Sequence, residues 1–479
     1  MLNYFLSLNF LYLLPLVAIF FILVTPSSYS KFLALSFSII TFIYSILLGI
    51  VYNPIEANQF LESYSVFGKI FVVGLDGISL NFILLTAFIL PICKLTSYKS
   101  INTFIKEFYI SLISIELILF GVFSVMDILG FYILYEAVLI PMFLIIGVWG
   151  ARKEKITAAY YFFFYTFVGS IIMLISIIYL YNETGTTDYN VLLSQGLPKE
   201  VQKYVFLAFL ASFAVKIPKY PFHIWLPLAH VEAPLAGSIL LAAVLIKLGS
   251  YGFIRFALPL LPDACIYFAP LVNCLAVLAI IYASITTIRQ TDLKRIIAYS
   301  SIGHMGVVML GIFSLTTEGV EGSIYLQIGH GLVSSALFII VTNLYDRHHS
   351  RLVKYYRGMV ITMPIFTIMF LLFTMANIAV PLSCNFIGEF LSLYSIYTTN
   401  IFIGIVGGIG IILSACYALL LLNRVAFGSM SPYITQNRDL DRREYYILLP
   451  LAILTVLFGV YPTWILEKIH FSVVSILLP

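Results

Sequence analysis

Long apolar stretches separated by short polar segments run through the whole chain. A helix that crosses a membrane needs about 20 mostly apolar residues, and stretches of that kind recur from one end of the chain to the other. Their pattern predicts an all-α polytopic membrane protein with about 14 transmembrane helices. The predicted helices are 4–24, 31–51, 77–95, 107–125, 128–149, 157–181, 204–226, 235–256, 264–287, 295–314, 322–345, 360–396, 402–425 and 445–466.

The basic residues support this number of helices. When each loop is numbered by the helix that it follows, 18 Lys and Arg residues lie in odd-numbered loops and 4 in even-numbered loops. Basic residues concentrate on the cytoplasmic or matrix side of a membrane. The odd-numbered loops are therefore predicted on that side, and both termini on the opposite side.

Two predicted helices contain internal prolines. Pro218 and Pro221 fall in the seventh helix and Pro381 in the twelfth, and a proline inside a helix kinks or breaks it. The two broken helices are five apart, so the second copy of a five-helix repeat would be inverted in the membrane. Inverted repeats with discontinuous helices in matching positions are typical of ion transporters.

The composition agrees with a membrane protein and excludes several functions. The chain is 61% hydrophobic and 10% charged, whereas soluble domains carry about 25% charged residues. A net charge of +4 gives no indication of nucleic-acid binding. The five cysteines are scattered rather than clustered as metal or iron–sulfur ligands are, and no nucleotide-binding motif is present. We therefore expect no cofactor in this chain.

The first predicted helix, 4–24, has no basic region before it and no Ala-x-Ala cleavage site. It also lacks the Arg- and Ser-rich, amphipathic character of a transit peptide. We therefore expect a bacterial protein, or one made inside the organelle that uses it.

Charged side chains inside the predicted helices are the strongest indication of function. Each costs about 3 kcal/mol at the centre of a bilayer, so six cost on the order of 18 kcal/mol, more than the stability of a typical domain. We expect them to be paired, neutral or hydrated in an internal channel. They are Glu116, Glu136, Lys216, Lys219, Lys247 and Glu389.

Glu136 and Lys216 are candidates for a functional ion pair. Burial destabilises the charged form of a lysine, and a carboxylate about 4 Å away restores about 4 kcal/mol at an effective dielectric constant of 20. A small movement of the glutamate would then make the lysine take up or release a proton. A static, structural ion pair is the alternative.

Lys247 lies near the middle of its predicted helix and has no acidic residue three or four positions away. This favours a link in a proton relay over the alternative, a side chain that reaches towards the membrane interface. His304 and His330 can both donate and accept a proton near neutral pH, and in line with lysines they favour the same role. His223 and His230, seven residues apart towards the end of the seventh helix, are candidates for capping or gating. A packing role is the alternative for each histidine.

Five segments resemble the chain 4 family of NADH–ubiquinone oxidoreductase, an antiporter-like membrane subunit of respiratory complex I. The resemblance covers most of the chain, and HVEAPLAGS with the following IKLGSYG favours chain 4 over the related chains 2 and 5. The segments are FYILYEAVLIPMFLIIGVWG (131–150), VKIPKYPFHIWLPLAHVEAPLAGSILLAAVLIKLGSYGFIRF (215–256), TDLKRIIAYSSIGHMG (291–306), GHGLVSSALF (329–338) and NFIGEF (385–390).

The resemblance implies a single transmembrane domain, 1–479, with inverted repeats made of helices 4–8 (107–256) and helices 9–13 (264–425). The helices within 1–95 and 445–479 flank the repeats.

The resemblance also implies roles for single residues. Glu136 would pair with Lys216, and Lys247 would pass the proton on. His304 and His330 would continue the relay along the central axis. Glu389, in the FIGEF segment, would be the terminal site of the second half-channel. Many relatives carry a lysine where this chain has Leu228, so no role is expected at that position.

The function implied is proton translocation coupled to NADH oxidation by ubiquinone, in an obligate hetero-oligomer of the mitochondrial inner membrane. FMN, iron–sulfur clusters and ubiquinone are expected in other subunits, chains 2 and 5 as neighbours, and lipids around the helices. The odd-numbered loops would face the matrix and both termini the intermembrane space. A stand-alone monovalent cation/proton antiporter and a non-conducting structural scaffold remain as alternatives.

Overall fold

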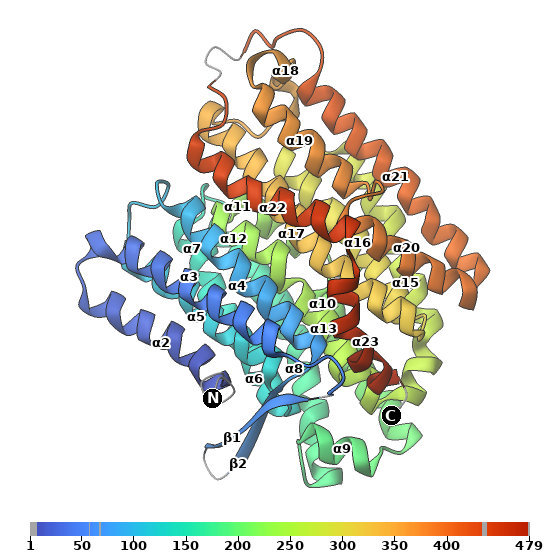
Figure 1. Ribbon diagram of the computed structural model, residues 1–479. Coiled ribbons are helices and arrows are strands. Elements are labelled where there is room, and N and C mark those ends of the chain that lie inside the picture. Colours follow the sequence, from blue (N-terminus) through green and yellow to red (C-terminus); the bar gives the residue numbers. More distant parts are fainter. Residues whose placement is uncertain (1–6, 57, 67–68, 434–437, 478–479) are drawn as a thin grey trace.

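The computed structural model describes residues 7–56, 58–66, 69–433 and 438–477. Most helices lie side by side in one bundle (Figure 1). The elements are α2 (Leu8–Val24), α3 (Ser27–Val51), β1 (Gln59–Val66), β2 (Lys69–Leu75), α4 (Gly77–Ser97), α5 (Ile105–Ser124), α6 (Ile128–Ala137), α7 (Leu139–Trp149), α8 (Lys155–Thr184), α9 (Tyr189–Gln195), α10 (Lys199–Lys216), α11 (Trp225–Glu232), α12 (Leu235–Leu240), η1 (Leu241–Leu245), α13 (Lys247–Gly252), η2 (Phe253–Ala257), α14 (Leu258–Leu260), α15 (Pro262–Arg289), α16 (Leu293–Ile312), α17 (Thr317–His348), η3 (Val353–Tyr355), α18 (Met359–Thr362), α19 (Pro364–Asn377), α20 (Cys384–Thr399), α21 (Ile401–Ala426), α22 (Arg442–Val460) and α23 (Thr463–Leu477).

Within these ranges, 11 helices are long and apolar enough to cross a membrane. Two of them, Ile128–Trp149 and Leu235–Leu260, are each built from consecutive shorter elements. Helices α2 and α19 are also apolar but shorter, with 17 and 14 residues. The predicted polytopic, helical architecture is confirmed.

Both proline-containing stretches are interrupted, as the sequence indicated. Helix α10 ends at Lys216, and Ile217 then takes up the extended conformation (φ −83°, ψ 102°) that is favoured before a proline. The chain becomes helical again only at Trp225. In the second stretch α19 ends at Asn377 and α20 begins at Cys384, so that Pro381 lies in the gap.

The two long polar connections contain structure that the apolar pattern did not predict. Strands β1 and β2 form an antiparallel hairpin within the predicted 52–76 loop, and α9 lies within the 182–202 loop. The hairpin contacts the segment after α5, because the amide of Met126 donates to the carbonyl of Val72 at 2.9 Å. Beyond the last predicted helix, α23 is a further helix that packs against α4 and α17.

Helix α17 lies at the centre of the bundle. It has 32 residues, and its most apolar segment is completely buried among α4, α12, α16, α19, α20 and α22. Its approach to α20 is close because Gly388 has no side chain: a Cβ there would lie 2.5 Å from the Cα of Leu326. A polar group on α17 is therefore held at a fixed place far from solvent.

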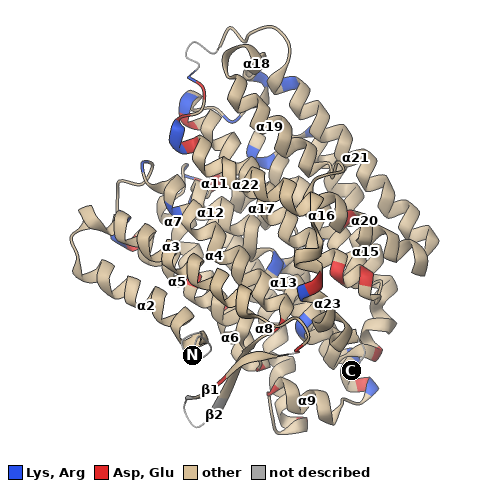
Figure 2. Ribbon diagram, viewed as in Figure 1, with Lys and Arg blue, Asp and Glu red and all other residues tan. Residues whose placement is uncertain are grey.

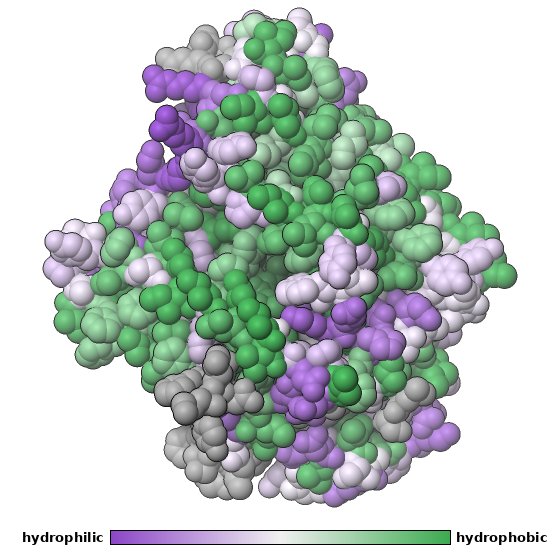
Figure 3. Space-filling model, in the orientation of Figure 1, coloured by the Kyte–Doolittle hydropathy of each residue, from purple (hydrophilic) through white to green (hydrophobic). Residues whose placement is uncertain are grey.

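The outer surface is apolar between two charged ends. Hydrophobic residues cover the middle of the molecule (Figure 3), and exposed apolar side chains line α3, α8, α15 and α21. Most Lys, Arg, Asp and Glu lie towards the ends of the helices (Figure 2). An exposed apolar band of this kind is the surface that lipid covers.

Candidate functional site

Lys216 is the last residue of α10 and is buried. Its Nζ donates a hydrogen bond to the carbonyl of Tyr135 at 2.7 Å and lies 3.2 Å from the centre of the Tyr135 ring. The carbonyl is near the end of α6, where a helix leaves its last carbonyls without partners in the helix. The proline break thus leaves a buried ammonium group against a carbonyl and an aromatic face.

Glu136, next to Tyr135, does not form the expected ion pair with Lys216. Among the described residues, no ion pair joins the two groups, and both carboxylate oxygens of Glu136 are buried without a hydrogen-bond partner. The physical reason is that the Tyr135 carbonyl already binds the lysine. The two charges nevertheless lie close enough to interact electrostatically.

Lys247 begins α13 and is fully buried. A π-helical turn precedes it and another follows α13, and such turns within helices are frequent at functional sites. Its Nζ contacts the carbonyl of Ala242 and lies 3.2 Å from Nδ1 of His330 on α17. A lysine and a histidine from two helices are thus in direct contact.

The contacts continue from His330 to an acidic residue. The rings of His330 and His304, on α16, have their centres 5.5 Å apart. Nδ1 of His304 lies 2.7 Å from Oε1 of Glu389, on α20. Lys247, His330, His304 and Glu389 therefore form one buried row, called the central row below.

A cavity of about 20 Å³ adjoins the Glu389 end of the central row. Its lining includes His304, Glu389, Tyr417 and the hydroxyl-bearing residues Ser284 and Ser414. A water molecule needs about 10–15 Å³ and two to four polar partners, so this cavity can hold one. Water there would extend the row beyond Glu389.

Glu116, a secondary candidate, has a partner that the sequence did not reveal. Its Oε2 lies 3.1 Å from Nζ of Lys94, and its Oε1 accepts a hydrogen bond of 2.7 Å from the Thr41 hydroxyl. Lys94 lies near the end of the predicted helix 77–95; in the structure it lies on α4 and is 1% exposed. The pair is separate from the central row, because neither residue contacts any of its members in the described structure.

The other candidates lie outside the central row. His223 is in the turn between α10 and α11, so its predicted place on the same helix as His230 is wrong. His230 stacks on Phe338 with ring centres 4.7 Å apart, and neither of its ring nitrogens has a partner among the described residues. Lys219 is buried and likewise unpartnered within the described part of the chain.

Two polar contacts near Lys247 were not predicted. Ser250 donates to Oε1 of Gln327 at 2.5 Å, joining α13 to α17. Farther along the same helix, Arg255 pairs with Asp76 at 2.7 Å. Each joins residues more than 75 positions apart, so spacing along the sequence carried no signal for either.

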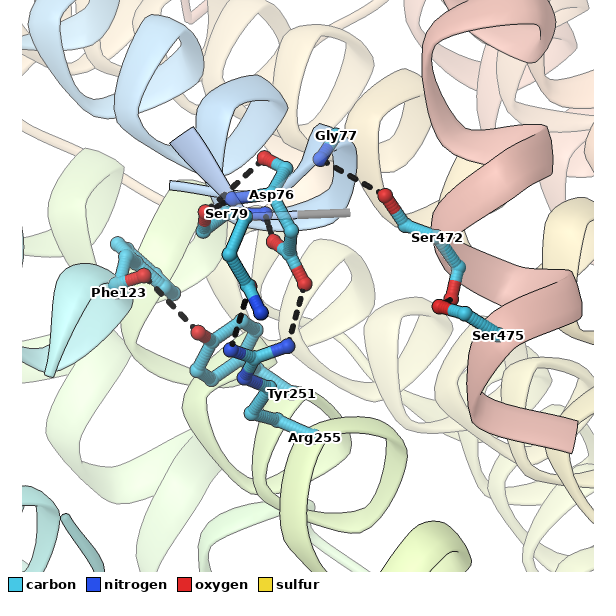
Figure 4. A network of polar contacts seen from close by, with 9 residues as sticks. Asp76, Gly77, Ser79, Phe123, Tyr251, Arg255, Ser472 and Ser475 are labelled. Carbon is cyan, nitrogen blue, oxygen red and sulfur yellow. Dashed lines mark hydrogen bonds and ion pairs between the residues drawn. The ribbon is translucent and has the colours of Figure 1, made fainter. Parts of the chain in front are cut away.

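The Arg255–Asp76 pair belongs to a larger network (Figure 4). The hydroxyl of Tyr251 donates to the carbonyl of Phe123 at 2.9 Å, and the amide of Gly77 donates to Ser472 on α23 at 3.0 Å. The network ties the helix that carries Lys247 to the start of α4, the end of α5 and α23.

Where the structure describes side chains, no group of three or more His, Cys, Asp or Glu residues is placed to hold a metal ion. What the fold and the site define is a multi-pass membrane protein with proton-exchanging side chains in contact at its centre.

Comparisons with known proteins agree with this class. The family model described as NADH:quinone oxidoreductase/Mrp antiporter, TM, matches residues 125–414. NADH-ubiquinone oxidoreductase chain 4 of Metridium senile is 56% identical over 84% of this chain and 82% of its own length. The protein of the same name from Marchantia polymorpha is 49% identical over 98% of this chain and 96% of its own length.

A solved structure is similar over nearly the whole chain. Respiratory complex I from Thermus thermophilus with bound NADH contains a chain that is 28% identical, with a TM-score of 0.88, over 98% of this chain and 99% of that one. The protein belongs to the NADH:quinone oxidoreductase/Mrp antiporter family, among the chain 4 subunits of NADH–ubiquinone oxidoreductase.

Proposed function

We propose that this chain is the proton-translocating chain 4 subunit of respiratory complex I and that the central row is its proton relay. The observation that carries the proposal is the contact between Lys247, His330, His304 and Glu389. All four groups can exchange a proton, and they come from four separate elements. Burying ionisable groups at the centre of a membrane protein costs free energy, and such groups mark ion pathways and proton relays.

Glu136 and Lys216 act in this proposal as a switch beside the row. In the arrangement described here, Lys216 binds a carbonyl and Glu136 is unpaired. Bringing the charges to about 4 Å would gain about 4 kcal/mol at an effective dielectric constant of 20. Moving one charge against 100 mV costs about 2.3 kcal/mol. The switch is therefore strong enough to load or release a proton against the membrane potential.

The proposed membrane arrangement has fourteen crossings. The two interrupted stretches support counting α10 with α11, and α19 with α20, as one crossing each, and α2 supplies another. The two inverted repeats are assigned to 107–256 and 264–425, between the flanking helices of 1–95 and 445–479. The odd-numbered loops face the matrix and both termini face the intermembrane space, in the mitochondrial inner membrane.

The energy that moves Glu136 and Lys216 relative to each other comes from outside the chain. FMN, iron–sulfur clusters and ubiquinone are assigned to other subunits of the complex, and chains 2 and 5 to the neighbouring positions in the membrane. The names of the relatives and the structural similarity to complex I support this assembly.

Replacing Lys216 by alanine in the assembled complex tests the proposal. The complex should assemble but lose most proton pumping and coupled NADH:ubiquinone turnover, measured after reconstitution into liposomes. The matched control is Lys203→Ala on the same helix, because Lys203 is partly exposed and pairs with Glu200, whose side chain is exposed.

The other outcomes separate the alternatives. Normal pumping by the assembled Lys216→Ala complex would overturn the role of Lys216. Loss of assembly with an unchanged proton-to-electron ratio in the residual complex would favour a scaffold. Cation/proton exchange by the chain without a flavin- and iron–sulfur-containing partner would favour a stand-alone antiporter.

A further inference from the structure

A basic cavity of about 700 Å³ lies where α21 ends. Its lining includes the residues around η3 and those at the end of α21, which are about 70 positions apart in sequence. Three of the lining residues, Lys354, Arg357 and Arg424, are basic and none is acidic. Positive charge therefore gathers around a space large enough for a polar ligand.

Within the described residues, no ion pair or hydrogen bond involves the charged groups of these three cations. Lys354 lies over the ring of Tyr355, with its Nζ 4.8 Å from the ring centre. The residues outside the described ranges include no Asp or Glu. Nearby arginines differ, because Arg347 pairs with Glu444 at 2.6 Å and Arg351 lies 3.6 Å from Glu232. The cavity thus offers unneutralised donors to an anion from outside the chain.

The position of the basic cavity relative to the membrane indicates the source of that anion. Helix α21 is an apolar membrane helix with Arg424 in its last turn. Leu419, Leu420 and Phe427, at the same end, are exposed apolar side chains. Cationic residues lie at this end of the molecule, near α18 (Figure 2). Cationic groups at the end of a lipid-facing helix lie at the level of the phospholipid headgroups.

We propose that the basic cavity binds the phosphate headgroup of an anionic phospholipid, whose acyl chains lie along the exposed apolar side of α21. Arginine donors match phosphate oxygens in pairs, and basic pockets between helices on the matrix or cytoplasmic side bind the headgroups of anionic lipids. The proposal depends on α21 crossing the membrane and is independent of the route of the protons.

The test compares two double variants in the purified, assembled complex. Arg357→Gln with Arg424→Gln removes two charges from the basic cavity. The control, Arg152→Gln with Lys153→Gln, removes two exposed charges at the same end of the molecule. Its location follows from two contacts: the amide of the neighbouring Ala151 donates to the carbonyl of Glu232, and Glu232 lies 3.6 Å from Arg351. Each complex is delipidated, exchanged into nanodiscs with and without cardiolipin, and examined by native mass spectrometry.

We expect the cavity variant to retain one fewer cardiolipin molecule, and to need at least a tenfold higher cardiolipin fraction for saturation, while the control matches the wild type. Arg424→Lys keeps the charge and should retain most binding. Equal cardiolipin retention in all variants would overturn the proposal. So would a loss of cardiolipin when inorganic phosphate alone is added, because the cavity would then bind free phosphate. A neighbouring subunit cross-linked into the cavity, in place of lipid, would also overturn it.

Discussion

Replacing Glu389 by glutamine removes the acid at the end of the central row and keeps its size. Nδ1 of His304 and Oε1 of Glu389 are 2.7 Å apart, and both side chains are buried. Because each charge is spread over its group, an effective separation of about 4 Å is appropriate, which gives an attraction of about 4 kcal/mol at an effective dielectric constant of 20. An energy of that size corresponds to about a thousandfold in a rate or an equilibrium constant.

Coupled NADH:ubiquinone turnover and proton uptake in proteoliposomes measure the consequence. We expect turnover to fall at least about tenfold, and by up to about a thousandfold where proton transfer through His304 limits the rate. Glu389→Asp, which keeps the charge, should recover part of the rate.

Glu321→Gln is a matched control for Glu389→Gln. Glu321 lies 2.6 Å from Nδ1 of His470, but the His470 side chain is 64% exposed, and exposed pairs contribute about 0–1 kcal/mol. Its turnover should stay close to that of the wild type. If Glu389→Gln pumps as well as Glu321→Gln, the central row does not carry the protons.

Two further predictions concern stability. Lys94→Met or Glu116→Gln alone leaves a buried charge unpaired and should destabilise the protein by about 3–5 kcal/mol, seen as less assembled complex on blue-native gels. The double variant should recover most of the loss, and a double variant as poor as the sum of the singles would contradict the buried pair. Gly388→Ala places a Cβ 2.5 Å from the backbone of Leu326 and should cost about 1–3 kcal/mol. Gly408→Ala, where a Cβ meets nothing within 4 Å, should be neutral, and equal effects of the two changes would refute the close packing of α17 and α20.

The apolar pattern predicted the membrane helices well because length and hydrophobicity suffice for that assignment. It also located both interruptions, because a proline acts on its own helix. It could not find β1, β2 or α9, because runs of seven or eight residues are too short to be recognised as membrane helices.

The pattern located the buried charges but could not pair them. Lys247, His330, His304 and Glu389 come from four elements, so their contact is a property of packing. Lys94 was not among the candidates because it lies near the predicted end of its helix, and its contact with Glu116 depends on how α4 and α5 lie together.

The most direct test of the proton relay is the proton-to-electron ratio of a complex in which Lys247, at one end of the central row, can no longer carry a proton. Lys247→Met removes the ammonium group that contacts His330 and leaves an unbranched apolar side chain in its place. The relay predicts an assembled complex with a lower proton-to-electron ratio or with coupled turnover nearly lost. An assembled Lys247→Met complex with the wild-type ratio at the wild-type rate would contradict it.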